Sequence, residues 1–281
     1  MSYDQSVPNH YQHGSLLAAI ESALPALGKT INSVNIEDLA PVDEFHIGGR
    51  LATENLFNQF NFRKDHHILD IGCGLGGAAR YVAANYHTQV SGIDLTPEYI
   101  ETGTELCSWL GLSRKITLTQ GSALSMPYEA NQFDAGYMLH VGMNIEDKTS
   151  LFKEVFRVLK RGSSFGIYDI MRQNEGDLVY PVPWATEADT SKVATPEQYT
   201  LALQEAGFEI SSITNRGDFA KEFFKQQHSN IKANGGPPPL GLHVLMQQSG
   251  KLKIDNVVQN LHNGYIAPVE IIAHKKSVGD N

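Results

Sequence analysis

The sequence predicts an α/β fold built on a doubly wound, mostly parallel sheet. From residue 66 to about residue 170, short apolar runs alternate with helix-like segments. This alternation is typical of parallel strands covered by helices on both faces. The first apolar run stops at a cluster of glycines and the second at an acidic residue, as expected where strands end beside a ligand. One antiparallel strand is expected near the C-terminus.

The first 60 residues are expected to form a helical lid that precedes the sheet. Ser15 is placed to cap a helix that is broken near Pro25. A second helix is expected after Gly48 and Gly49, and residues 41–50 are expected to form the loop between the two helices.

The remaining elements follow from the same patterns. Strands are expected at residues 67–71, 89–93, 116–120, 133–139, 164–170, 208–214 and 265–274. Helices are expected at residues 75–86, 97–110, 148–159 and 196–206. These elements form one domain over residues 61–281, in which residues 218–262 are a helical insertion.

Composition narrows the class of protein. The net charge is −9, from 22 Lys and Arg against 31 Asp and Glu, which argues against nucleic acid as the main partner. Two cysteines, Cys73 and Cys107, do not make a disulfide framework in a chain of 281 residues. The chain has no apolar signal core or membrane-length apolar run, so a soluble, cytoplasmic monomer or homodimer is expected. No metal is expected. Five histidines lack any metal-like spacing: His10, His13, His46, His66 and His67.

The most informative segment is the glycine-rich turn after the first strand. Glycines at 72, 74 and 77 follow a strand and precede a helix, so the backbone is free to approach a ligand closely. Asp94, at the end of the second strand, is placed to accept hydrogen bonds from two ribose hydroxyls. This much fits a dinucleotide as well as other nucleoside cofactors.

Further motifs distinguish a dinucleotide from another nucleoside cofactor. Asp70 precedes the glycines, Gln120–Leu124 follows the third strand, and Phe156–Gly162 precedes the fifth. Together these segments resemble the motifs of class I S-adenosylmethionine-dependent methyltransferases over about residues 60–215. The resemblance implies a Rossmann-like fold, S-adenosylmethionine as cofactor and a methyl-transfer reaction. It places Asp70 against the amino group of the cofactor's methionine part.

The resemblance also implies the other cofactor contacts. These are Gly48, Gly49, Gly72, Cys73, Gly74, Leu95, Ser122, Ala123 and His140. Ser122 departs from the family pattern, because many members have an acid there. Serine still accepts a hydrogen bond from the adenine amino group, more weakly, and Ala123 offers its backbone N–H.

Within this family the chain is most similar to the small-molecule branch. Gly74–Tyr81 and Val182–Ala185 resemble sarcosine and dimethylglycine N-methyltransferases, and the Gly48–Gly49 pair and His140 resemble phosphoethanolamine methyltransferases. An amine acceptor of the glycine, sarcosine or dimethylglycine kind is therefore expected. The phosphate-binding cluster of the phosphobase enzymes is not evident.

Two residues are candidates for catalysis. His140 follows the fourth strand, at the sheet edge where ligands bind, and its ordinary pKa suits proton transfer near neutral pH. It could instead only pack against the cofactor. Tyr11 is expected to close over the cofactor, as a tyrosine does in the phosphobase group; the alternative is a surface aromatic residue.

The acceptor pocket is expected to contain Asn144, Tyr168, Asp169 and Trp184. Each also has a structural alternative: a helix cap for Asn144, strand packing for Tyr168 and Asp169, and a core anchor for Trp184. Arg50 either holds a carboxylate of a ligand or is a solvated helix residue. The alternative functions are C-methylation of a quinone or another ring, a non-catalytic cofactor-binding regulator, and an NAD-dependent oxidoreductase.

Overall fold

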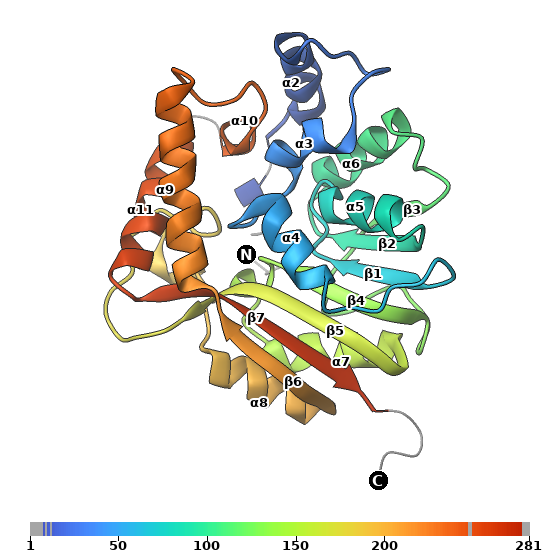
Figure 1. Ribbon diagram of the computed structural model, residues 1–281. Coiled ribbons are helices and arrows are strands. Elements are labelled where there is room, and N and C mark those ends of the chain that lie inside the picture. Colours follow the sequence, from blue (N-terminus) through green and yellow to red (C-terminus); the bar gives the residue numbers. More distant parts are fainter. Residues whose placement is uncertain (1–7, 9, 12, 247–248, 277–281) are drawn as a thin grey trace.

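The chain forms a single seven-stranded sheet in the order β3-β2-β1-β4-β5-β7-β6 (Figure 1). The computed structural model describes residues 8, 10–11, 13–246 and 249–276. The strands are β1 (His67–Ile71), β2 (Gln89–Asp94), β3 (Ile116–Gln120), β4 (Phe133–Leu139), β5 (Leu159–Arg172), β6 (Phe208–Asn215) and β7 (Ile266–Lys275). Strands β1 to β5 pair in parallel, whereas β7 runs antiparallel to both β5 and β6. The predicted doubly wound sheet with one antiparallel strand is confirmed.

Helices cover both faces of this sheet (Figure 1). They are α2 (Leu16–Ala23), η1 (Leu24–Leu27), α3 (Ile36–Asp43), α4 (Gly49–Phe57), α5 (Gly77–Asn85), α6 (Pro97–Trp109), η2 (Gly142–Asn144), α7 (Lys148–Val158), η3 (Ala188–Thr190), α8 (Pro196–Ala206), α9 (Gly217–Ala233), α10 (Leu242–Met246) and α11 (Gly250–His262). One buried cluster joins the sheet to α7 and α8, and a second joins it to α4 and α5.

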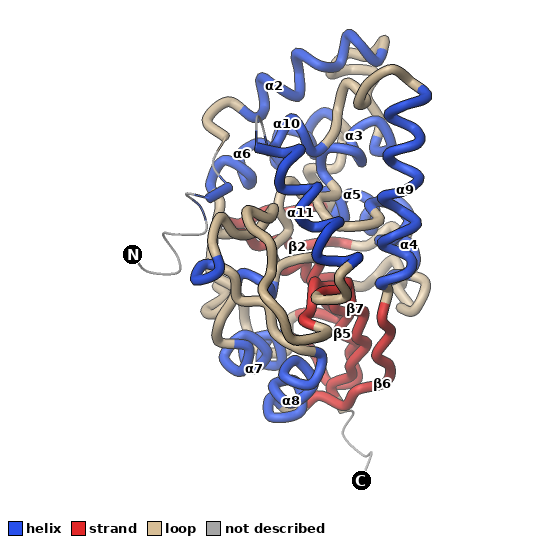
Figure 2. Tube along the Cα trace, turned by 90° about the vertical axis from the view of Figure 1, so that its left-hand side faces the viewer, coloured by secondary structure: helices blue, strands red, loops and turns tan. Residues whose placement is uncertain are grey.

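The N-terminal helices and the helices between β6 and β7 gather at one end of the sheet. Figure 2 shows α2, α3, α9, α10 and α11 on the side of the molecule away from α7 and α8. Leu240 belongs to the same buried cluster as Leu16 and Leu39, so the segment before α10 packs on α2 and α3. These helices therefore stand over the carboxyl ends of β1, β2 and β4, where ligands bind in such sheets.

Two expectations about the N-terminal segment are wrong. Residues 41–50 are not all loop, because α3 continues through Pro41 to Asp43. The Asn35–Asp38 capping box starts this helix, and burial of Leu39 and Val42 offsets the hydrogen bond that proline cannot donate.

The expected cap of the first helix differs as well. Ser15 precedes α2 but makes no side-chain cap hydrogen bond. The backbone N–H of Leu16 instead donates to the Glu98 carboxylate on α6, at 2.9 Å. The carboxylate accepts from a backbone N–H that has no partner within the helix, as a serine cap would do. Its negative charge also interacts favourably with the helix dipole.

Candidate functional site

The glycine turn after β1 is shaped by its neighbours. Gly72 has φ 67°, and a Cβ on it would lie 2.3 Å from Cγ2 of Val141. The N–H groups of Gly72 and Cys73 donate to the carbonyl of Ile93 at 2.8 and 3.0 Å, which ties the turn to β2. Gly74 has φ 53° and faces open space. The sequence thus forms a rigid turn whose backbone borders a cavity.

Two buried carboxylates flank this turn. Asp70 is 2% exposed and its Oδ2 has no hydrogen-bond partner. Burial raises the pKa of Asp70 to about 7. Asp94 accepts the N–H of Thr96 on Oδ1 at 2.8 Å and the N–H of Gly74 on Oδ2 at 3.0 Å. Burial also raises the pKa of Asp94. Both acids lie on the wall of the cavity.

The structure brings most of the predicted cofactor residues to this cavity. Its wall includes Gly72, Cys73, Gly74, Leu95, Ala123 and His140. Ser122 is not part of the wall, and its hydroxyl accepts the N–H of Leu124 at 3.3 Å. Gly48 and Gly49 are also off the wall. Gly48 is confined by the Phe219 ring, which a Cβ would approach to 2.5 Å.

His140 stands at the opposite end of the cavity in an unusual conformation. Its φ is 54°, a region that few residues other than glycine adopt. Its N–H donates to the carbonyl of Tyr168 at 2.8 Å, and its ring stacks on the Tyr168 ring with centroids 5.3 Å apart. The Nε2 atom is buried without a hydrogen-bond partner. Burial, and then the neighbouring His46, hold the pKa of His140 well below its ordinary value, so the ring is neutral.

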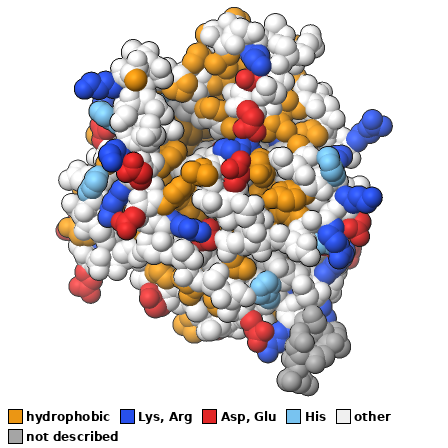
Figure 3. Space-filling model, in the orientation of Figure 1, with side chains coloured by type: hydrophobic (Ala, Val, Ile, Leu, Met, Phe, Trp, Pro, Cys, Tyr) orange, Lys and Arg blue, Asp and Glu red, His pale blue; other side chains and the backbone are white. Residues whose placement is uncertain are grey.

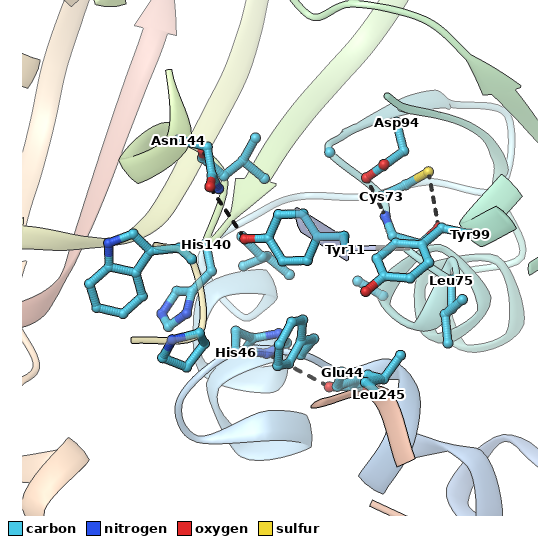
Figure 4. A pocket seen from close by; sticks show the side chains of 18 of the residues that line it. Tyr11, Glu44, His46, Cys73, Leu75, Asp94, Tyr99, His140, Asn144 and Leu245 are labelled. Atoms are coloured by element: carbon cyan, nitrogen blue, oxygen red, sulfur yellow. Dashed lines mark hydrogen bonds and ion pairs between the residues drawn. The ribbon is translucent and has the colours of Figure 1, made fainter. Parts of the chain in front are cut away.

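Tyr11 lies between the two ends of the cavity (Figure 4). Its hydroxyl donates to Oδ1 of Asn144 at 3.3 Å, and both residues belong to the wall. Its ring packs against Phe45 and Tyr99, with centroids 6.3 and 6.1 Å away. The N-terminal segment therefore crosses the cavity, as expected for a residue that covers a ligand.

Two other predicted pocket residues do not reach the cavity. Tyr168 is 1% exposed and donates to the carbonyl of Ile47 at 2.9 Å. Asp169 accepts the hydroxyl of Tyr199 at 2.7 Å. The reason is that β5 continues to Arg172 along its antiparallel partner β7, so residues 168 and 169 lie inside a strand rather than at its end. Trp184 is part of the wall.

Sequence reasoning missed a buried polar network beside His140. Glu44 and His46 lie on the cavity wall, and Thr53 on α4 connects them. The Thr53 hydroxyl donates to Glu44 Oε2 at 2.6 Å and lies 3.0 Å from His46 Nε2. Arg50 Nη1 approaches Glu44 Oε1 to 2.8 Å, so this arginine holds a carboxylate of the chain itself.

The signal for this network was present in the sequence. Glu44, His46 and Arg50 flank the Gly48–Gly49 pair, whose close turn folds the start of α4 back onto the segment before it. The part of the chain that the structure describes has no group of His, Cys, Asp and Glu side chains that could hold a metal ion.

The end of the cavity beyond His140 is apolar. Its side chains come from the 183–184 turn, α9 and α11: Pro183, Trp184, Phe223, Phe224 and Val257. Leu245 on α10 lies instead on the side of Leu75 and Tyr99 (Figure 4). No Lys or Arg occurs among the described residues of the wall, which does include four acids. The cavity has a volume of about 1400 Å³, its open mouth included. Hydrophobic side chains also gather on the molecular surface between α9 and α4 (Figure 3).

Comparison with known proteins finds a family model that matches the segment around the glycine turn. Residues 69–167 match the family model described as "Methyltransferase domain". A sterol 24-C-methyltransferase of Aspergillus fumigatus is 34% identical over 114 residues, which are 41% of this chain and 30% of that protein. The chain spans about half or less of the length of the curated relatives it matches.

Solved structures share the whole architecture. A putative sarcosine dimethylglycine methyltransferase from Galdieria sulphuraria covers 80% of this chain, with 85% of that chain aligned, at a TM-score of 0.65 and 20% identity. Phosphoethanolamine N-methyltransferase 2 of Haemonchus contortus covers 99% of this chain, with 61% of that chain aligned, at a TM-score of 0.74 and 18% identity. These likenesses establish a Rossmann-like methyltransferase fold. No helix in the described part of the chain is long and apolar enough to span a membrane.

Proposed function

We propose that this chain, whose residues 69–167 match a methyltransferase domain, transfers the methyl group of S-adenosylmethionine to a small acceptor with an apolar skeleton. One observation carries the proposal. The cavity has two buried carboxylates and a glycine turn at one end, and at the other end an apolar, cation-free pocket beside neutral histidines.

The residues at the first end fit the cofactor. Asp70 offers a buried oxygen with no partner in the protein, which suits the ammonium of the methionine part. Gly74 leaves open space where a Cβ would project, so a ligand can approach the backbone. Asp94 presents its carboxylate to the cavity, and a carboxylate offers about four lone-pair sites, which leaves room for ribose hydroxyls beside the N–H groups of Thr96 and Gly74. When bound, the cofactor supplies a methyl group already activated on a positively charged sulfur.

The chain's own residues then position the acceptor and exclude water. Tyr11 and Asn144 bridge the cavity from the N-terminal segment to η2. Trp184 is fixed by a hydrogen bond from Nε1 to the Ser191 hydroxyl at 3.0 Å, so its ring is a rigid wall. Orientation and exclusion of water account for much of the catalysis when a reactant is already activated.

The lining of the second end selects the acceptor class. A carboxylate or phosphate buried there would lack a charged partner, since the wall has no Lys or Arg among its described residues. This disfavours free glycine, sarcosine or a phosphobase as acceptor. Aromatic and aliphatic side chains favour a ring or chain that is largely apolar. The ring-methylation alternative thus has better support from the site than the amino-acid amine predicted from the sequence.

Two experiments test the proposal. Calorimetric titration should show binding of S-adenosylmethionine and no binding of NADH; the reverse would indicate an oxidoreductase. A mass-spectrometric screen then compares acceptors matched in reacting group: para-nonylphenol with para-hydroxyphenylacetate, and N-methylnonylamine with sarcosine. Methylation of the apolar member of either pair is expected. Cofactor binding with methylation of only the charged members would contradict the acceptor class, and binding without any methylation would favour a regulatory protein.

A further inference from the structure

We infer that His46 is the residue that takes the proton released when the acceptor is methylated, with Glu44 stabilising the resulting imidazolium through Thr53. The inference rests on the proposed function. In the step, a lone pair on the acceptor atom X forms the bond to the methyl carbon, while the carbon–sulfur bond breaks and leaves its electron pair on sulfur. The X–H bond also breaks, and its electron pair stays on X. The proton moves from the acceptor atom to Nδ1 of His46.

The hydrogen bonds of His46 determine which nitrogen is free. Its Nε2 lies 3.0 Å from the carbonyl oxygen of Gly49. Because a carbonyl only accepts, Nε2 must carry the hydrogen. Thr53 gives its single hydroxyl hydrogen to Glu44, so it too can only accept from Nε2. The lone pair therefore resides on Nδ1, which has no hydrogen-bond partner among the described residues.

The His46 ring lies where an acceptor in the cavity can reach this lone pair. His46 lies on the cavity wall, and its ring centroid is 6.0 Å from that of His140. Figure 4 shows His46 and His140 next to each other, with Tyr11 and Asn144 nearby and Asp94 at the far side of the cavity. An acceptor held in the apolar end therefore meets both imidazoles, while the glycine turn holds the opposite end.

The surroundings decide which imidazole accepts a proton. Among the described residues, the groups that face His46 are Glu44 and Arg50 from the N-terminal segment, His140 after β4 and Tyr168 on β5. Glu44 Oε2 lies 3.9 Å from His46 Nε2, with its side chain fully buried.

His140 has no such partner. Its ring faces Tyr168 and His46, and the charge of a protonated His46 nearby disfavours a second positive charge. Burial lowers the pKa of His46 to about 4, and the nearby charge of Arg50 also lowers it, so His46 is neutral before the step. A proton that passes to His46 during the step meets the carboxylate of Glu44, which His140 lacks, and a buried cation needs a nearby anion. His140 retains the role of an acceptor contact through its unpartnered Nε2.

Glu44 makes the step pH-dependent. Burial raises the pKa of Glu44 to about 7, so this carboxyl is neutral below that pH and ionised above it. Only the ionised form offsets the charge of His46. Turnover should therefore rise with pH through about 7 in the wild type, and this step should vanish in Glu44→Gln.

The first test requires neither an acceptor nor turnover. The full chain labelled with ¹⁵N-histidine, with S-adenosylhomocysteine added, should show the Nε2–H tautomer for the resonance that disappears in His46→Gln. An Nδ1–H tautomer would overturn the inference whether or not the proposed function holds.

The second test compares the two imidazoles by the pH dependence of turnover with para-nonylphenol. The rise of kcat with pH should be lost in His46→Gln and retained in His140→Gln. A rise that survives in His46→Gln and is lost in His140→Gln would overturn the inference.

Kinetics on para-nonylphenol complete the comparison. His46→Gln should lower kcat by about 10²- to 10⁴-fold, the usual contribution of a placed acid–base group, with affinity for S-adenosylhomocysteine within about threefold of the wild type. Thr53→Val, which removes only the connecting hydroxyl, should lower kcat by less. An undiminished kcat in His46→Gln would refute the proton-acceptor role while leaving the proposed function intact. Loss of cofactor binding in the wild type would refute the proposed function instead.

Discussion

Asp70→Asn should stabilise the ligand-free protein and weaken cofactor binding at the same time. The rise in the pKa of Asp70 from 3.8 to about 7 corresponds to at most about 4 kcal/mol of unfavourable free energy for the ionised carboxylate in the fold. The folded state binds the proton more tightly than the unfolded state. The free energy of unfolding therefore falls as pH rises from about 4 to about 7, and the penalty is fully present above pH 7. Asparagine removes it, since its amide does not ionise.

The expected measurements follow from this fall in the free energy of unfolding with rising pH. Urea denaturation at pH 8 should give Asp70→Asn a higher free energy of unfolding than the wild type, and the difference should vanish near pH 4. The variant should bind S-adenosylhomocysteine about 10- to 150-fold more weakly, because it loses a charge-assisted hydrogen bond worth about 1.5–3 kcal/mol. Wild-type affinity should also fall about tenfold between pH 8 and pH 6, as the carboxyl takes up a proton.

Asp134→Asn is the matched control. Burial raises the pKa of Asp134, but the His67 N–H at 2.8 Å and the Lys160 ammonium at 2.7 Å outweigh it and leave this pKa below its ordinary value. The control should lose stability at pH 8 and bind the cofactor product normally. An Asp70→Asn variant that is less stable than the wild type at pH 8, with unchanged affinity for S-adenosylhomocysteine, would refute the reasoning.

Three further predictions concern the walls of the site. Asp94→Ala should weaken both S-adenosylmethionine and S-adenosylhomocysteine by at least about tenfold in calorimetry, and unchanged affinity for both would exclude a ribose contact. Arg80→Met leaves the buried Asp43 without its partner and should lower the free energy of unfolding, measured by urea denaturation, by about 3–5 kcal/mol. Adding Asp43→Asn should recover much of this loss, and an equal loss in the single and double variants would contradict the pairing. Glu98→Gln weakens three hydrogen bonds accepted from the backbone of residues 13–16 and should speed hydrogen exchange there without changing α5; equal exchange would argue against this anchor.

The sheet and the cofactor end of the site were predictable because their signals are local. A strand that runs into glycines or an aspartate identifies its own end, and the ends of neighbouring parallel strands meet at one edge. Asp70 and Asp94 therefore needed no knowledge of packing to be placed together. The apolar end was not predictable, because its wall comes largely from α9 and α11, and the place of these helices over the sheet depends on tertiary contacts.

The misplacement of Tyr168 and Asp169 has one physical origin, the length of β5. The sequence predicts this strand at residues 164–170, whereas its ladder with β7 continues to Arg172. Antiparallel pairing along a long partner keeps Tyr168 and Asp169 inside the sheet, so their side chains bond to Ile47 and Tyr199. The apolar pattern of a strand gives its existence more reliably than its end, and a pocket residue depends on the end.

The contacts of the first 60 residues divide the predicted lid into two parts that differ in how they are held. Residues 36–57 are tied to the sheet domain through the fully buried Asp43–Arg80 ion pair and through Phe57, which is packed against Tyr137 at 4.6 Å between ring centroids. Moving them would expose a buried charge, so they are better described as a fixed wall that carries Glu44 and His46. Residues 10, 11 and 13–16 are held by hydrogen bonds that they donate to Glu98, Asn144 and Pro183, which water can replace, and by the packing of Tyr11 and Leu16. We therefore expect this shorter segment to open for a ligand more readily than residues 36–57, which carry Glu44 and His46.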